Sequence, residues 1–207
     1  EAYRILFTNL KFSSPDKPLQ TLTVTSSVPA EGKSLTAANL ALTATQNSEK
    51  VLLVDGDLRN PTQHQLFDIK NKPGLTDVIL GNLDLPTAIS IIKGLHVLPA
   101  GSIPPNPSQL LGSIKMRQLL RQMKEYAELV IIDTPPASMI TDAALVASIT
   151  DGVILVIESG KTLIDQAVNT KEILRNVRAN ILGVVINKAV NFKSKSYYYH
   201  YRYYSQK

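Results

Sequence analysis

The chain has 207 residues, of which 44% are hydrophobic and 19% charged, so it can bury a core and is not disordered throughout. Its longest apolar runs fall short of the roughly 18 residues that a membrane span needs, and it has no cysteine for a disulfide or a thiol nucleophile. Three scattered histidines argue against a zinc site. Because the first residue is Glu1 instead of Met, we expect a piece of a longer polypeptide.

The net charge of +5 is concentrated at one end of the chain. Seven basic residues and no acidic residue follow Glu172, whereas the preceding residues hold 15 basic and 17 acidic side chains. A basic groove for nucleic acid would place this charge on the folded body. We therefore expect no nucleic-acid partner.

Apolar, β-branched runs of strand length alternate with segments of helical periodicity. The predicted strands are Thr21–Ser26, Val51–Asp55, His96–Leu98, Leu129–Asp133, Gly152–Glu158 and Leu182–Asn187. The predicted helices are Ser34–Gln46, Lys115–Glu125, Thr141–Ser148 and Thr162–Arg178, and four prolines predict a loop over Pro99–Pro107. Several strands lack polar alternation, which is typical of parallel strands covered on both faces. The order predicts an α/β fold with a mostly parallel sheet and ligands at the carboxyl ends of its strands.

A phosphate-binding loop follows the first predicted strand and opens the first of these helices. Its sequence is Ser27-Val-Pro-Ala-Glu-Gly32-Lys33-Ser34, with Ser27 in place of the usual first glycine. Backbone N–H groups and the helix N-terminus would surround the phosphates, while Lys33 adds positive charge and the Ser34 hydroxyl reaches Mg²⁺. The strand–loop–helix context favours this interpretation over a chance turn. The predicted nucleotide-binding residues are Pro29, Ala30, Glu31, Gly32, Lys33, Ser34 and Leu35.

Three carboxylates follow two buried strands. Asp55 and Asp57 end the run from Val51, and Asp133 ends the run from Leu129. One such residue could simply cap a helix, but three beside a phosphate loop favour a site in which Ser34, Asp57 and Asp133 hold Mg²⁺ directly or through water. Arg59 is close enough to pair with either a carboxylate or a phosphate, and the sequence leaves that choice open.

The C-terminal segment has an unusual composition. From Ser194 it runs SKSYYYHYRYYSQK, with six of the eight tyrosines of the chain inside eight residues. An aromatic edge strand is one interpretation, but the absence of Val and Ile and the terminal position favour a flexible tail. We expect a domain over residues 1–193 and a tail over 194–207, with candidate phosphoacceptors Tyr197, Tyr198, Tyr199, Tyr201, Tyr203 and Tyr204.

These motifs together resemble the P-loop ATPases that carry an additional acidic strand motif, which include partition and septum-positioning ATPases and the bacterial tyrosine kinases of exopolysaccharide synthesis. Partition-type proteins carry a second lysine early in the phosphate loop, where Val28 stands here. The run Asp55-Gly-Asp57-Leu-Arg59-Asn-Pro61, the loop 101–111 and the tyrosine cluster resemble the kinase branch. The alternatives are a partition-type ATPase that acts as a nucleotide-switched binding protein, and a regulatory module phosphorylated by another enzyme. The intact phosphate loop and three acids argue against the second.

The resemblance implies an ATP- and Mg²⁺-dependent tyrosine autokinase that phosphorylates its own C-terminal tyrosine cluster. A tethered tail could act in cis, but the family favours transfer between subunits. A tyrosine hydroxyl has a pKa near 10, so a kinase must orient it and accept its proton, and we assign that role to Asp55 with Lys33 as the charge stabiliser.

Asn187 resembles the residue that contacts adenine in related ATPases; a turn-forming Asn at a strand end is the alternative.

The resemblance also implies partners. Glu1 and Arg4 match a motif for contacts in a ring of subunits, but Phe7 replaces its second arginine, and an amphipathic helix packed on its own body is the alternative. A membrane polysaccharide co-polymerase, separate or fused, and a protein-tyrosine phosphatase are implied partners. The implied location is the cytoplasmic face of the bacterial membrane.

Overall fold

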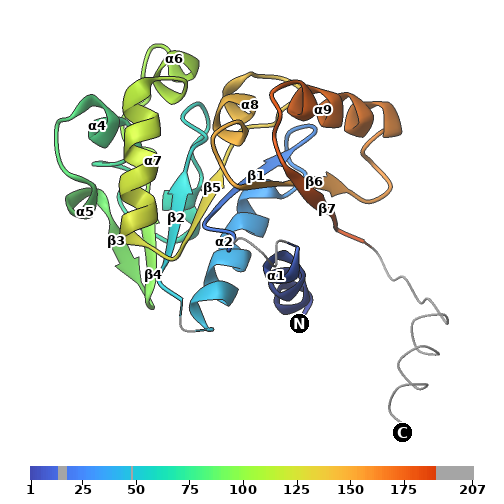
Figure 1. Cartoon of the computed structure of the whole chain (residues 1–207), viewed down its shortest axis with the longest axis horizontal. Helices are drawn as coiled ribbons and strands as arrows, with labels where there is room; N and C mark the ends of the chain where they lie inside the picture. The colour runs from blue at the N-terminus through green and yellow to red at the C-terminus, as the bar shows by residue number, and fades with distance from the viewer. Residues whose placement is uncertain (14–17, 48, 190–207) are drawn as a thin grey trace, which may run out of the picture.

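The computed structural model describes residues 1–13, 18–47 and 49–189. In this part of the chain seven strands form one sheet, in the order β3-β4-β2-β5-β1-β6-β7 (Figure 1). The strands are β1 (Thr21–Ser26), β2 (Val51–Asp55), β3 (Ser90–Ile92), β4 (Leu95–Leu98), β5 (Leu129–Asp133), β6 (Gly152–Glu158) and β7 (Ile181–Asn187). All neighbouring pairs are parallel except β3 and β4. The expected α/β P-loop fold is confirmed, while the tyrosine cluster lies outside the described residues.

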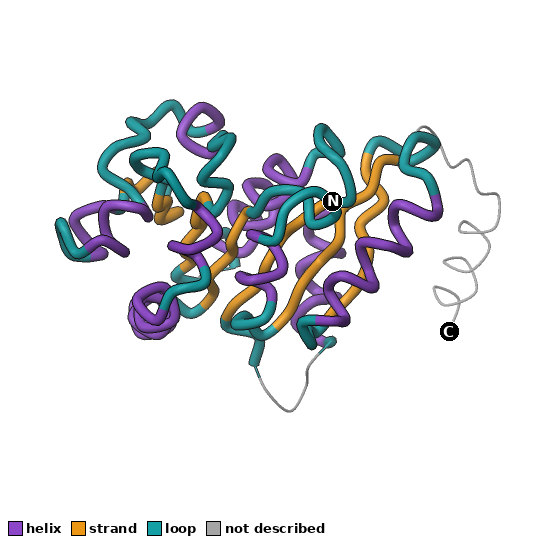
Figure 2. Tube along the Cα trace, turned by 90° about the horizontal axis from the view of Figure 1, so that it is seen from above, coloured by secondary structure: helices purple, strands orange, loops and turns teal. Residues whose placement is uncertain are grey.

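The helices lie on both faces of the sheet (Figures 1 and 2). They are α1 (Ala2–Phe12), α2 (Lys33–Thr45), α3 (Gln63–Leu66), α4 (Leu75–Leu80), α5 (Leu85–Ala88), α6 (Pro107–Leu111), α7 (Ile114–Tyr126), α8 (Asp142–Ala147) and α9 (Ile164–Asn176). Alternate residues of β2 and β5 belong to two different apolar clusters, one shared with α1 and α2 and the other with α4, α5 and α7. Burial of both faces explains why these strands show no polar alternation.

The edge at β3 differs from the sequence prediction. Ser90–Ile92 pairs antiparallel with β4 through a tight turn at Lys93 and Gly94, both of which have positive φ. A three-residue strand is too short to show a hydrophobic alternation. The short helices α3 to α6 were not predicted for the same reason, because they are too short to show a helical period. The proline-rich segment is a loop until α6 begins at Pro107.

The first helix packs on the body of its own chain. Phe7 and Leu10 of α1 are buried in the cluster that includes α2, whereas the Glu1 and Arg4 side chains are largely exposed and 3.9 Å apart. Phe7 therefore serves the core at the position where the ring motif has its second arginine. A role of Glu1 and Arg4 between subunits stays a prediction. Within the described ranges, no helix combines the length and apolar character required to cross a bilayer.

The strand order brings the predicted site together. β1 lies between β5 and β6, and β2 lies on the other side of β5. In this register Asp55 at the end of β2 lies directly opposite Asp133 at the end of β5, and β1 leads into the phosphate loop. The carboxyl ends of β1, β2 and β5 thus converge, as expected for a ligand site in an open parallel sheet.

Candidate active site

The phosphate loop occupies the junction of β1 and α2 that the sequence predicts. Its backbone has positive φ at Ala30 (65°) and Gly32 (90°), and Gly32 caps the N-terminus of α2. A Cβ atom on Gly32 would lie 2.1 Å from Nδ2 of Asn187, so the loop needs glycine for its conformation and for the close approach of β7. The 13-residue helix α2 presents its N-terminal N–H groups at this loop, a geometry suited to phosphate.

A buried carboxylate fixes the shape of this loop from within. Glu31 accepts a hydrogen bond from the backbone N–H of Val28 at 2.8 Å, and its other oxygen accepts from the hydroxyl of Thr162. Asn187 donates from Nδ2 to the carbonyl of Glu31 at 2.9 Å. Asn187 therefore contacts the phosphate loop directly, and its proposed contact with adenine stays a prediction.

A second contact reaches the loop from the end of β7. Lys188 donates from Nζ to the carbonyl of Ala30 at 2.9 Å and also pairs with Glu158 at 3.0 Å. Lys161 pairs with the same carboxylate at 3.4 Å, and these partners lower the pKa of Glu158, with the hydrogen bond from Lys188 as the main cause. Sequence reasoning missed these supports because they come from elements more than a hundred residues away along the chain.

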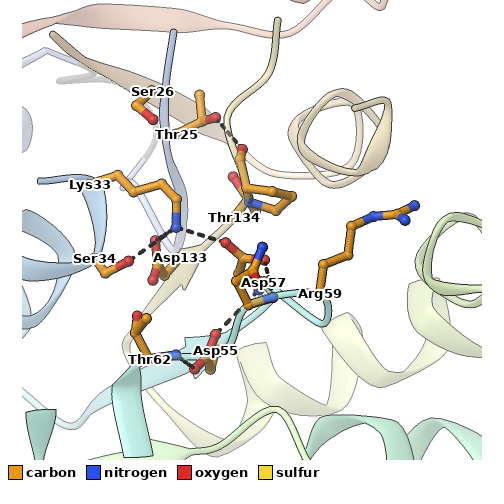
Figure 3. Close-up of polar contacts among 12 residues, drawn as sticks. Thr25, Ser26, Lys33, Ser34, Asp55, Asp57, Arg59, Thr62, Asp133 and Thr134 are labelled. Carbon is orange, nitrogen blue, oxygen red and sulfur yellow. Dashed lines mark hydrogen bonds and ion pairs between the residues drawn. The ribbon is translucent and has the colours of Figure 1, made fainter. Parts of the chain in front are cut away.

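Lys33 links the phosphate loop to the acidic residues (Figure 3). Its Nζ lies 2.9 Å from Oδ2 of Asp57, 3.4 Å from Oδ1 of Asp133 and 3.1 Å from Oγ of Ser34. Burial alone would lower the pKa of Lys33, but the charges of Asp133, Asp57 and Asp55 leave it raised. Lys33 therefore stays protonated. The structure brings the predicted residues of this cluster together.

Asp55 lies beneath this cluster with its side chain buried. It accepts hydrogen bonds from the backbone N–H groups of Thr62 and Gln63, each at 2.9 Å, and from that of Asp57 at 3.3 Å. Burial, followed by the charge of Asp133, raises the pKa of Asp55 to about 7 even though the hydrogen bonds from Gln63 and Thr62 act in the opposite direction. A carboxylate with this pKa can accept or release a proton near neutral pH.

Gln63 holds Asp133 in place and was not predicted from the sequence. Its Nε2 donates to Oδ2 of Asp133 at 2.9 Å and to the carbonyl of Ser34 at 3.1 Å. Burial raises the pKa of Asp133, and the nearby Lys33 charge only partly offsets that effect. Gln63 therefore joins the end of β5 to the first turn of α2.

The oxygen atoms of this site suit Mg²⁺. Among the described residues, no group of three or more His, Cys, Asp and Glu side chains forms a metal cage. Ser34, Asp57 and Asp133 instead offer one hydroxyl and two carboxylates around Lys33. Mg²⁺ usually keeps several waters and is held by one or two carboxylates together with substrate phosphates, so these residues fit that ion.

Arg59 contacts a carboxylate, one of the two partners that the sequence left open. Its side chain points away from Lys33 and Asp57 (Figure 3). Nε lies 2.9 Å from Oδ2 of Asp142, and Nη2 lies 3.4 Å from Oδ1 of Asp142 and 3.1 Å from Oγ of Ser108. Neither partner was predicted from the sequence, where Asp142 looks like an ordinary acidic residue in the first turn of a helix.

Fold and site together define a P-loop nucleotide-binding protein, and sequence comparison agrees. The profile of the ParA family, described as NUBPL iron-transfer P-loop NTPase, matches residues 19–206. Tyrosine-protein kinase YwqD of Bacillus subtilis (strain 168) is 42% identical over 202 residues, which cover 97% of this chain and 85% of that kinase.

Solved structures show the same relationship. The chimerical protein CapA2B2 matches with a TM-score of 0.87 and 38% identity, over 91% of this chain and 84% of the other. The kinase domain of the Escherichia coli tyrosine kinase ETK matches with a TM-score of 0.86 and 34% identity, over 93% and 78% respectively. The chain therefore belongs to the ParA-type P-loop NTPases and, among them, to the bacterial tyrosine-protein kinase family.

Proposed function

We propose that this chain is an ATP-dependent tyrosine autokinase that phosphorylates its C-terminal tyrosine cluster, mainly between subunits, and thereby regulates exopolysaccharide synthesis and export. The observation that supports this most is the convergence of Lys33, Ser34, Asp57 and Asp133 above the buried Asp55. The kinase relatives support the reaction class.

The proposed reaction needs few groups. The amides of the phosphate loop and Lys33 bind the phosphates, and in the transition state they stabilise the charge on the transferred group. The tyrosine oxygen forms a bond to the γ-phosphorus while the bond from that phosphorus to the bridging oxygen of ADP breaks, and the phenolic proton passes to Asp55. Mg²⁺ held by Ser34, Asp57 and Asp133 would neutralise charge on the phosphates.

Two features favour a kinase over a partition-type switch. Val28 offers no amine at the position of the second lysine, and its N–H is already bonded to Glu31 within the loop. Burial and the charge of Asp133 raise the pKa of Asp55 to about 7, which suits the acceptor of the tyrosine proton.

The proposed tail would act as a charge switch. Residues 173–207 carry seven basic and no acidic side chains, and each phosphate adds about −1.5 to −2 at neutral pH. Phosphorylation of four tyrosines would therefore bring this region close to neutral, and phosphorylation of five or six would make it negative. An unmodified tail can approach Asp55, Asp57 and Asp133, whereas a phosphorylated tail meets them as like charge and leaves. If tails inserted into neighbouring subunits hold a ring together, phosphorylation should dissolve that ring.

The remaining partners follow the same proposal. Glu1 and Arg4 would contribute to the contacts between subunits. A membrane co-polymerase would recruit the kinase to the cytoplasmic face of the membrane, and a tyrosine phosphatase would reset the tail.

The decisive experiment is self-labelling of the purified chain with Mg-ATP, followed by mapping of phosphotyrosine and light scattering. We expect labelling within residues 197–204 and a smaller assembly after labelling. A variant with the six tail tyrosines changed to Phe keeps the length and charge of the tail, and deletion of 194–207 removes both; each should lose nearly all phosphotyrosine. Absence of phosphotyrosine in the wild-type chain, with ATP hydrolysis retained, would favour the partition-type ATPase. Strong labelling of the truncated chain at Tyr3 or Tyr126 would contradict the tail as acceptor.

A further inference from the structure

Three residues, Arg59, Ser108 and Asp142, connect three segments that follow strands of the sheet, and we call them the Arg59 clamp. Arg59 lies in the loop after β2, Ser108 in α6 after β4, and Asp142 at the start of α8 after β5. Ser108 also donates a hydrogen bond to Oδ1 of Asp142. The clamp therefore ties together segments that are 49 and 83 residues apart in sequence.

The burial of Asp142 makes this link strong. Its side chain has no exposed area, while that of Arg59 is 36% exposed, and the guanidinium meets the carboxylate through two nitrogens. In the described part of the chain, Arg59 is the only cationic side chain within ion-pair distance of Asp142. Removal of Arg59 leaves the buried carboxylate of Asp142 without its opposite charge, so opening the clamp costs more than opening a pair of two exposed side chains.

The clamp anchors the turn that surrounds the reactive acids. The backbone N–H of Asn60 donates to Oδ1 of Asp57 at 3.0 Å, and those of Thr62 and Gln63 donate to Asp55. These three amides come one, three and four residues after Arg59. The orientation of both carboxylates therefore depends on a turn whose outer end is fixed by Asp142.

The phosphate loop does not share this anchor. It is contacted by Thr162 after β6, by Asn187 and Lys188 at the end of β7, and by Ser138 after β5, whose hydroxyl donates to the carbonyl of Ser27. The turn after Arg59 reaches it through Gln63, which donates to the carbonyl of Ser34. We infer that Arg59 is a positioning residue for phosphotransfer: through Asp142 and Ser108 it holds Asp55 and Asp57 in register with the bound phosphates without taking part in nucleotide binding. The inference rests on the proposed kinase function.

The test compares chemistry with binding in the full 207-residue chain. Arg59→Met breaks the clamp, Asp142→Asn removes the buried charge, and Arg59→Gln is the conservative variant because its amide nitrogen occupies the place of Nε and can still donate to Asp142. The Arg175→Met variant is a matched control, since Arg175 makes an exposed pair with Glu172. Each variant receives two measurements: kcat for tyrosine phosphorylation of a tagged Lys33→Met chain at saturating Mg-ATP, and affinity for a fluorescent ADP in EDTA.

We expect kcat to fall at least about 10-fold in Arg59→Met and Asp142→Asn, with ADP affinity within about twofold of wild type, because the effect is on positioning. Arg59→Gln should recover much of the rate and Arg175→Met should match wild type. Wild-type kcat in both clamp variants overturns the inference, and so does a loss of ADP affinity in proportion to kcat, which would mean general destabilisation. If Arg59→Met does not fold, the same ratio in Arg59→Gln and Asp142→Asn decides. A wild-type chain that makes no phosphotyrosine contradicts the proposed function instead.

Discussion

The two halves of the site are built differently. The phosphate loop is shaped by backbone conformation and by contacts to its backbone carbonyls from the end of β7 and from Ser138 after β5. The acidic half is shaped by buried charges at the ends of β2 and β5, with Arg59 and Gln63 as supports. The backbone of Lys33 belongs to the phosphate loop, and its ammonium group pairs with the carboxylates of the acidic half. The difference indicates that binding and chemistry can be altered separately, and that Lys33 couples them.

The largest effect should follow removal of that coupling. Lys33→Met leaves the phosphates and the acids without the charge between them, and we expect at least a ~1000-fold loss of phosphotyrosine formation. Circular dichroism should show an intact fold, because Lys33 contributes charge and not core packing. Lys171→Met, at an exposed position of α9, is the control. Wild-type phosphotyrosine in Lys33→Met would refute the assignment of the phosphate loop.

A change confined to the acidic half should separate chemistry from binding. Asp55→Asn cannot accept the tyrosine proton, so phosphotransfer should fall about 100-fold while ATP affinity stays within a few-fold. Quenched-flow phosphorylation and calorimetric titration with ATP measure the two quantities. Should ATP affinity disappear together with activity, Asp55 is mainly a metal ligand and its proposed role is wrong.

The Asp55→Asn variant also tests how the raised pKa of Asp55 affects the stability of the fold. The pKa of Asp55 is raised from its ordinary 3.8 to about 7 in the folded chain, so the folded state holds this proton more tightly than the unfolded state does. The stabilisation is fully present below the unfolded pKa and is lost as pH rises toward 7. Between these values the group lowers the free energy of unfolding by up to about 1.4 kcal/mol per pH unit. Urea denaturation at pH 5, 6 and 7 should show this slope in wild type and a smaller slope in Asp55→Asn, where the raised pKa of Asp133 still contributes with the same sign.

Local patterns predicted the parts of this site that depend on a single segment. A glycine before Lys33 and acids after buried strands are motifs of a few residues, and strand order then brings them together. The clamp could not be predicted because Arg59 and Asp142 are 83 residues apart, and nothing in either local pattern specifies the other. Phe7 illustrates the same limit: whether a residue of an amphipathic helix faces its own core or a neighbour depends on tertiary packing.

A change confined to the phosphate loop should weaken binding without altering the acids. Gly32→Ala forces a Cβ into the left-handed backbone region and against Asn187, whose bond to Glu31 must then break. We expect about 10-fold weaker binding of ADP. Gly160→Ala is a matched control, because Gly160 has a φ of 71° but no atom within 4 Å of the added Cβ. Equal ADP affinity in Gly32→Ala and wild type would mean that the loop tolerates the shift of Asn187.

The smallest effect should come from the outer support of the same loop. The Lys188 side chain is 48% exposed, so its pair with Glu158 is screened by solvent, and its bond to the Ala30 carbonyl is the contact that matters for the loop. One such hydrogen bond contributes about 0.5–1.5 kcal/mol, and exposure places this one at the low end. Lys188→Ala should therefore weaken ADP binding about twofold to threefold, with kcat at saturating ATP unchanged. Lys161→Ala removes a lysine from the same carboxylate without touching the loop and should leave ADP affinity at the wild-type value. Lys188→Arg, which keeps a donor, should restore most of the affinity. If Lys161→Ala weakens binding as much as Lys188→Ala does, the charge on Glu158 supports the loop and the hydrogen bond to Ala30 does not.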